Sequence, residues 1–184
     1  MNTVWTNQVD TDCPLPEYPR PQLARRGWVC LNGKWEYAIN SSSRQPGTFD
    51  GEILVPFSPE TRLSGVQRRL RPGEYLWYRR EVVLPDSYRT RRVLLHFGAV
   101  DQVCTVWVNG VQFPTHTGGY TAFTYDITEA IDDTDEQIIL VRVTDDTDKS
   151  YHTRGKQKTR RGGIWYTPQS GIWQTVWMEA VPED

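Results

Sequence analysis

The sequence Val106-Trp107-Val108-Asn109-Gly110-Val111-Gln112-Phe113 predicts two short β-strands joined by a tight turn. The Asn-Gly pair favours this turn because both residues readily adopt the positive φ angles of a type I′ turn, whose twist matches that of paired antiparallel strands. Val106 and Val108 alternate with Trp107, which is typical of a half-buried strand. We therefore expect an antiparallel hairpin at this point.

The same alternation with a period of two recurs along the chain. We expect it to place nine side chains in the core: Trp35, Tyr37, Val93, Leu95, Phe97, Val106, Val108, Val141 and Val143. Only one helical turn is predicted, at residues 126–131, where Asp126 and Glu129 have the spacing of a capping box. Many short strands with scarcely any helix indicate an all-β protein, an antiparallel β-sandwich with jelly-roll topology.

Length, charge and proline content predict one domain preceded by an arm. The chain has 184 residues, of which 38% are apolar, and this suffices for one large core. Pro14, Pro16, Pro19 and Pro21 favour extended chain, so we expect an N-terminal arm at residues 1–26 and a β-sandwich domain at residues 27–184. The net charge of −2 and the absence of a long apolar run disfavour both nucleic acid and a membrane as partners.

The cysteines and the N-terminus indicate a cellular setting. Cys13, Cys30 and Cys104 are odd in number and widely spaced, which argues against a disulfide framework or a structural zinc site. Residues 1–12 are polar and acidic and lack the apolar region of a signal peptide. We therefore expect a reduced, cytoplasmic protein with no metal and no cofactor.

Familiar catalytic motifs do not occur in the sequence, which has no H-E-x-x-H, G-x-S-x-G, G-x-G-x-x-G or P-loop pattern. Most acidic residues fall where we expect turns, including Asp50, Asp86, Asp101 and residues 132–136. His96 alternates with core positions, which favours a structural role. We therefore assign no catalytic residue.

The segment at residues 149–174 differs from the rest because it is long, lacks alternation and mixes basic with aromatic residues. Its basic residues gather at residues 154–161, and Trp165, Tyr166 and Trp173 follow them. Long loops in compact domains are usually functional, and several large aromatic side chains need a surface to pack on. This pattern predicts a surface that grips a ligand or a partner. The alternative is a solvated loop with aromatic side chains packed beneath it.

Motifs spread over nearly the whole chain resemble the N-terminal sugar-binding domain of family 2 glycoside hydrolases, which include the β-galactosidases. In chain order they are Arg20-Pro21-Gln22, Leu31-Asn32-Gly33-Lys34-Trp35, Trp77-Tyr78-Arg79-Arg80, Gly98-Ala99-Val100-Asp101, Val106-Trp107-Val108-Asn109-Gly110, Gly118-Gly119-Tyr120 and Gly171-Ile172-Trp173-Gln174. Their order and spacing together make the resemblance specific. It implies a β-sandwich of the galactose-binding-domain type.

The resemblance implies a longer enzyme whose other domains, with a carbohydrate substrate, are the partners of this chain. In the family, an immunoglobulin-like domain and a catalytic barrel follow, and the general acid of the barrel is a Glu that follows an Asn. This sequence contains no Asn-Glu dipeptide and ends at Asp184, so we expect a fragment or a separately expressed domain that is not catalytic and packs on the barrel. An autonomous carbohydrate-binding module is the alternative. A nucleic-acid binder that uses the basic loop is disfavoured because acidic residues outnumber basic ones.

The resemblance also implies which residues meet the sugar. In β-galactosidase members, an Asp after a Val-x-Val strand reaches the active-site edge, and Asp145 is the matching position. We expect Asp145, Trp165 and Tyr166 to form a substrate-binding rim, because a carboxylate accepts hydroxyl hydrogen bonds and an aromatic face stacks on a pyranose. The alternative is that Asp145 caps a turn and that both aromatic side chains fill the core.

Contact with the partner domain is expected from four further residues: Arg154, Lys156, Gln157 and Trp173. Two segments, residues 154–157 and 164–167, depart from the pattern of the best-known β-galactosidase. The sugar and its linkage are therefore left open.

Overall fold

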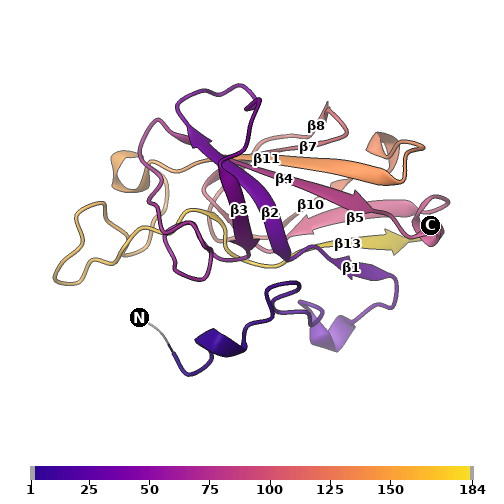
Figure 1. Cartoon of the computed structure of the whole chain (residues 1–184), viewed down its shortest axis with the longest axis horizontal. Coiled ribbons are helices and arrows are strands. Elements are labelled where there is room, and N and C mark those ends of the chain that lie inside the picture. The colour runs from indigo at the N-terminus through magenta and orange to yellow at the C-terminus, as the bar shows by residue number, and fades with distance from the viewer. Residues whose placement is uncertain (1–2, 183–184) are drawn as a thin grey trace.

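The computed structural model describes residues 3–182, which form β-strands joined by loops and short 3₁₀ turns (Figure 1). The strands are β1 (Trp28–Cys30), β2 (Gly33–Asn40), β3 (Gly51–Val55), β4 (Tyr75–Val83), β5 (Arg92–Phe97), β6 (Val100–Asp101), β7 (Val103–Val108), β8 (Val111–Gln112), β9 (His116–Thr117), β10 (Phe123–Asp126), β11 (Glu136–Thr144), β12 (Gly171–Ile172) and β13 (Val176–Val181). The 3₁₀ turns are η1 (Thr6–Gln8), η2 (Pro21–Leu23), η3 (Asp86–Tyr88), η4 (Thr128–Ala130) and η5 (Thr147–Lys149). The prediction of an all-β protein is confirmed. Among residues 3–182, no helix is long and apolar enough to cross a membrane.

Two antiparallel sheets pack face to face as a sandwich. The smaller has the strand order β1-β13-β5-β10, and the larger has the order β3-β2-β4-β11-β7-β8, with β9 also paired to β7. A separate two-stranded pair, β6 with β12, joins Asp101 to Gly171 in register. Figure 1 shows the smaller sheet lying below the larger one, with the N-terminal residues outside it. The predicted antiparallel sandwich is therefore the observed architecture.

The core lies between the sheets and follows the alternation in the sequence. Eight of the nine predicted core side chains are buried, whereas Tyr37 is only half-buried. Tyr37 lies opposite Gly51 on the edge strand β3, and a glycine has no side chain with which to cover the ring. At the centre, Trp35 packs edge-on against Tyr78, with ring centroids 6.3 Å apart.

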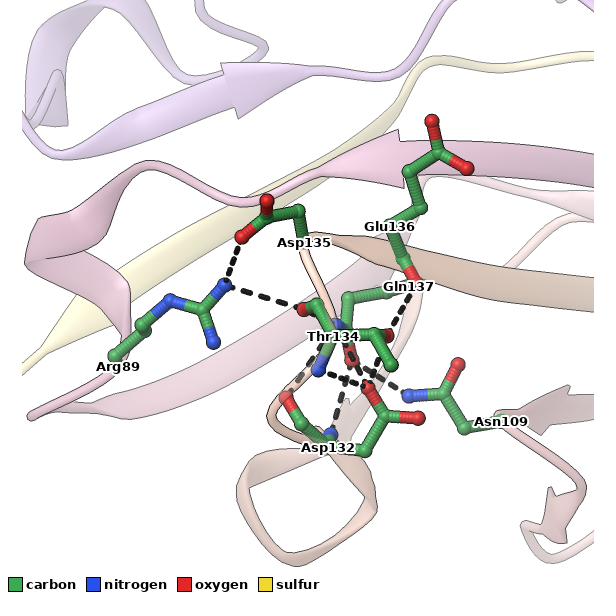
Figure 2. A network of polar contacts seen from close by, with 7 residues as sticks. All are labelled: Arg89, Asn109, Asp132, Thr134, Asp135, Glu136 and Gln137. Atoms are coloured by element: carbon green, nitrogen blue, oxygen red, sulfur yellow. Dashed lines mark hydrogen bonds and ion pairs between the residues drawn. The ribbon is translucent and has the colours of Figure 1, made fainter.

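The predicted hairpin forms between β7 and β8. Asn109 and Gly110 have φ angles of 47° and 82°, as the type I′ turn requires. The Asn109 side chain also donates from Nδ2 to Oε1 of Gln137 at 2.6 Å (Figure 2). Its Oδ1 accepts from the backbone N–H of Ile138 at 2.8 Å. The turn residue thus ties the hairpin to the start of β11.

Acidic residues near this hairpin hold a turn together. Gln137 is buried and donates from Nε2 to Oδ1 of Asp132 at 3.1 Å, while Arg89 pairs with Asp135 at 3.0 Å (Figure 2). The predicted helical turn forms as the short 3₁₀ turn η4, but its N-cap is Ile127 and it has no side-chain cap hydrogen bond, so the predicted capping box is not observed. Asp126 instead accepts from the backbone N–H of Thr128 at 3.1 Å. These carboxylates serve the fold, as their predicted position in turns suggested.

The chain before β1 lies against the smaller sheet. Tyr18 packs edge-on against Trp28, with centroids 5.1 Å apart, and its hydroxyl donates to Glu179. Glu179 is buried and also accepts from Nε1 of Trp177 at 2.9 Å and pairs with Arg25 at 3.1 Å. Burial alone raises the pKa of Glu179, but these partners outweigh it and hold the pKa below its usual value. The contacts of Tyr18 and Arg25 with Glu179 therefore anchor the N-terminal segment to the smaller sheet.

Candidate functional site

Asp145 lies at the end of β11, where the chain leaves the larger sheet. Its carboxylate is only 4% exposed. One oxygen accepts from the backbone N–H of Thr147 at 2.7 Å, and the other accepts from the hydroxyl of Ser170 at 2.8 Å. Burial raises the pKa of Asp145. This is the geometry of the turn-capping alternative, and contact between Asp145 and a sugar stays a prediction.

Asp101 is a second buried carboxylate at the same end of the sandwich. The sequence assigned it to a turn, but it belongs to β6 and is 4% exposed, because β6 pairs with the distant strand β12. Its Oδ2 accepts from Nε2 of Gln157 at 3.1 Å. Burial, with smaller contributions from Asp145 and Glu60, raises the pKa of Asp101 to about 7.

Glu60 completes a layer of three carboxylates beneath the long loop. It accepts from the backbone N–H groups of Ser170 at 3.1 Å and Leu70 at 3.3 Å, and burial raises its pKa. Ser170 therefore bridges Glu60 and Asp145. In the chain from residue 3 to 182, no three His, Cys, Asp or Glu side chains are grouped so as to hold a metal ion.

The long loop turns back on itself over this layer at residues 154–166, a segment we call the loop hairpin, in which Gln157 and Tyr166 form a parallel bridge and Gly162 and Trp165 an antiparallel one. The backbone N–H of Tyr166 donates to the carbonyl of Lys156 at 2.8 Å, and that of Lys158 donates to the carbonyl of Tyr166 at 3.1 Å. Gly162 and Trp165 exchange two further backbone hydrogen bonds at the tip. Figure 1 shows this segment extending beyond the sheets.

Trp165 and Tyr166, the two aromatic residues predicted to form the rim, lie in the second half of this loop hairpin. Tyr166 is 66% exposed. Trp165 is half-buried, and the Lys158 ammonium lies 5.0 Å from the centroid of its ring. Neither side chain fills the core, and among the described residues neither is hydrogen-bonded to Asp145. The structure therefore separates the exposed aromatics from the buried carboxylate layer.

The four predicted partner-contact residues divide into two groups. Lys156 is exposed and Arg154 is half-buried, so both remain available to a partner. Gln157 instead ties the loop down, since it donates to Asp101 and to Tyr120 at 3.2 Å and accepts from the backbone N–H of Gln169 at 2.5 Å. The fourth is Trp173, which donates from Nε1 to the carbonyl of Gly119 at 2.7 Å.

Sequence reasoning missed Asp101, Glu60 and Tyr120 as parts of this site. A signal existed for two of them, because Asp101 and Tyr120 belong to motifs that resemble the family pattern. Glu60 carries no comparable signal, since its neighbours Leu70 and Ser170 are brought to it only by the fold.

The raised pKa of Asp101 makes a testable prediction about stability. Because the pKa of Asp101 is raised in the folded state, folding favours the protonated carboxyl group. Its contribution to the free energy of unfolding is therefore lost as pH rises from about 4 towards 7. Asp101→Asn keeps an acceptor for Gln157 but cannot ionise. We expect the free energy of unfolding between pH 5 and pH 7 to fall less in this variant, by about 1 kcal/mol or more.

Urea unfolding at the two pH values measures this difference. The exposed Asp133, replaced by Asn, is the matched control and should leave the pH dependence unchanged. Parallel pH profiles for Asp101→Asn and the unsubstituted chain would contradict the prediction.

The fold and this site define a β-sandwich binding domain with an aromatic and cationic loop at one end. Residues 67–182 match the family model described as "Glycosyl hydrolases family 2, sugar binding domain". The chain belongs to this family.

The chain is also similar to individual glycosidases. The chain is 34% identical over 104 residues to the β-galactosidase of Thermoanaerobacter pseudethanolicus, covering 56% of this chain and 13% of that protein. It is 38% identical over 118 residues to the β-glucuronidase of Rattus norvegicus, covering 55% of this chain and 18% of that one. The solved β-glucuronidase of Lactobacillus rhamnosus superposes with a TM-score of 0.69 and 25% identity, covering 90% of this chain and 30% of that chain. This chain thus spans less than a third of the length of each of these relatives.

Proposed function

We propose that this domain works within a family 2 glycosidase, where it packs on the catalytic barrel and forms one wall of the sugar pocket. The observation that carries the proposal is the loop hairpin at residues 154–166, which exposes Tyr166 and part of Trp165 on a base held by hydrogen bonds. Aromatic faces stack on the apolar face of a sugar ring, and a site on an anchored segment holds its geometry. The substrate class proposed is a β-linked hexoside, on the basis of the names of the relatives.

We also propose the direct contact between Asp145 and the sugar that the resemblance implies. Both of its oxygens are already bonded, to Thr147 and Ser170. A sugar hydroxyl would therefore share an oxygen that has a further lone pair, because each carboxylate oxygen accepts more than one hydrogen bond. Asp145→Ala should lower kcat/KM of the full enzyme at least about tenfold, but it also removes two internal hydrogen bonds, so stability has to be measured beside it.

The partner surface is proposed from charge and exposure. Lys156 is exposed and Arg154 is half-buried in the same loop as the aromatic side chains, and Arg and aromatic residues are enriched in protein interfaces. We propose that they meet the barrel, with an immunoglobulin-like domain elsewhere on the molecule. We also propose that residues 1–26 act as an arm distinct from the sandwich at residues 27–184. Residues 1, 2, 183 and 184 lie outside the described part of the chain. The proposed setting of the protein is cytoplasmic.

An autonomous carbohydrate-binding module is the second candidate. The observation in its favour is that the loop hairpin is held by hydrogen bonds from this chain alone, through Gln157 and Tyr166. The two candidates differ in the affinity of the isolated chain for sugar. A module binds sugar by itself, whereas a single pocket wall binds it only weakly because most of the pocket is missing.

The isolated chain should not hydrolyse glycosides. Asp101 and Asp145 are buried, Glu60 is half-buried, and all three carboxylates accept hydrogen bonds from backbone or side-chain donors, whereas glycoside hydrolysis needs two carboxyl groups that face the scissile bond. Incubation with a panel of aryl β-glycosides, compared with buffer, measures this. Turnover above buffer that disappears in Asp101→Asn or Asp145→Asn would overturn the proposal.

A further inference from the structure

Two of the three cysteines lie side by side, one in the arm and one in the first strand. The thiol of Cys13 lies close enough to that of Cys30 to add, after burial, to the rise in the pKa of Cys30. The surrounding backbone fixes this placement, because Nδ2 of Asn32 donates to the carbonyl of Pro14 at 2.9 Å, and a Cβ on Gly33 would lie 2.4 Å from the carbonyl oxygen of Asp12. The chain on both sides of Cys13 is thus held directly on the residues that follow Cys30.

The pair differs from the third cysteine in access and in charge. Cys13 and Cys30 are half-buried, whereas Cys104 is wholly buried in the core. Arg80 lies beside both thiols, and its guanidinium is fixed by hydrogen bonds to the carbonyls of Asn32 at 3.3 Å and Lys34 at 3.0 Å. A positive charge favours the thiolate, which is the reactive form of cysteine. Burial opposes it and raises the pKa of Cys30 to about 11.

We propose that Cys13 and Cys30 are a modification site, which a low-molecular-weight disulfide oxidises to a disulfide bond that joins the arm covalently to β1. The widely spaced cysteines in the sequence argued against a disulfide framework, and the proposal concerns a single reversible bond instead. It does not depend on the proposed function.

The chemistry balances with oxidised glutathione as the oxidant. The thiolate of one cysteine attacks a sulfur of glutathione disulfide, which forms a mixed disulfide and releases one glutathione thiolate. The second cysteine then attacks the sulfur of the first and releases the other glutathione. Two protein thiols are oxidised, one glutathione disulfide is reduced to two glutathione molecules, and the two thiol protons pass to the leaving thiolates.

The bond would restrain the arm beyond the contacts that hold it now. Residues 13–30 would become a closed loop that contains Tyr18 and Arg25, both of which grip Glu179. Arg25 and Arg26 are exposed, so trypsin can cut the chain inside that loop. In the oxidised protein the arm would stay attached through the disulfide after such a cut.

The experiment exposes the whole chain to oxidised glutathione, blocks the remaining thiols with N-ethylmaleimide and identifies the cysteines by mass spectrometry. We expect loss of two hydrogens and a cross-linked peptide that contains Cys13 and Cys30. After trypsin treatment under native conditions, the arm should leave the reduced protein but stay with the oxidised protein until a reductant is added. Cys104→Ala is the matched control and should behave like the unsubstituted chain, whereas Cys13→Ser should lose the cross-link.

Two results would overturn the proposal. One is a stable mixed disulfide with glutathione on Cys13 while Cys30 still reacts with N-ethylmaleimide. The other is release of the arm from the oxidised chain at the same rate as from Cys13→Ser. A Cys30→Ser variant, which leaves the arm residue intact, checks that the loss of the bond rather than a change in folding explains the result.

Discussion

Gly171→Ala is expected to destabilise the chain by about 3 kcal/mol or more, because it combines backbone strain with overpacking of the core. Gly171 has a φ of +76°, and a Cβ there would lie 2.0 Å from the Tyr78 hydroxyl and 2.9 Å from a methyl group of Leu76. Tyr78 cannot move away easily, since it is wholly buried and its hydroxyl accepts from the backbone N–H of Ile172 at 3.1 Å.

The effect should also reach the carboxylate layer. Gly171 pairs with Asp101 in the short β6–β12 ladder, so any shift of β12 moves Asp101 and the Gln157 side chain bonded to it. Gly110→Ala is the matched control, because its φ is +82° but no heavy atom lies within 4 Å of the added Cβ. The control should cost only about 1 kcal/mol, which is the backbone term alone.

Urea denaturation of both variants separates the two terms. We expect the free energy of unfolding to fall about 2 kcal/mol further for Gly171→Ala than for Gly110→Ala. Equal losses for the two variants would show that Tyr78 yields to the extra methyl group, and that the tyrosine does not fix this end of the sandwich.

The sheets could be predicted from the sequence because their signals are local. Alternation identified eight buried core positions, and Asn109-Gly110 identified the hairpin, since each depends on residues within one strand or turn. Tyr37 was the exception in the core. Its exposure depends on Gly51 in the neighbouring strand, which alternation within β2 does not reveal.

The candidate site was harder to predict because its contacts join distant segments. Asp101 was assigned to a turn, yet pairing with residue 171 buries it. The loop at residues 154–166 was recognised by its composition, but its hairpin depends on Gln157 meeting Asp101 and Gln169. Asp145 was found through the resemblance alone, and the sequence did not reveal that Ser170 occupies one of its oxygens.

In the family 2 glycosidase proposed to contain this domain, the Trp165→Ala, Tyr166→Ala double variant is expected to lose about thirtyfold in kcat/KM. If these two aromatic faces form the proposed pocket wall, removing them would uncover roughly 80 Å² of apolar contact with the sugar, worth about 2 kcal/mol. The fold should be little affected, because Tyr166 is 66% exposed and Trp165 is half-buried at the edge of the loop hairpin. The backbone hydrogen bonds that form the hairpin do not involve either side chain.

Tyr151→Ala is the matched control for this variant. Tyr151 is 94% exposed and belongs to the same long segment, but it precedes the loop hairpin, and its ring lies 4.4 Å from that of His152. Its removal tests whether loss of any exposed aromatic residue from the segment lowers activity. Melting temperatures of all variants should agree closely, which separates a loss of sugar contact from a loss of folded enzyme.

The most direct test of the account is therefore the steady-state kcat/KM of the full-length enzyme on its best aryl β-glycoside, measured for the double variant and for Tyr151→Ala. The account predicts a fall of about thirtyfold for the double variant and no change for the control. Equal values for the two variants, or a fall that follows a lower melting temperature, would contradict the claim that this domain supplies a wall of the sugar pocket.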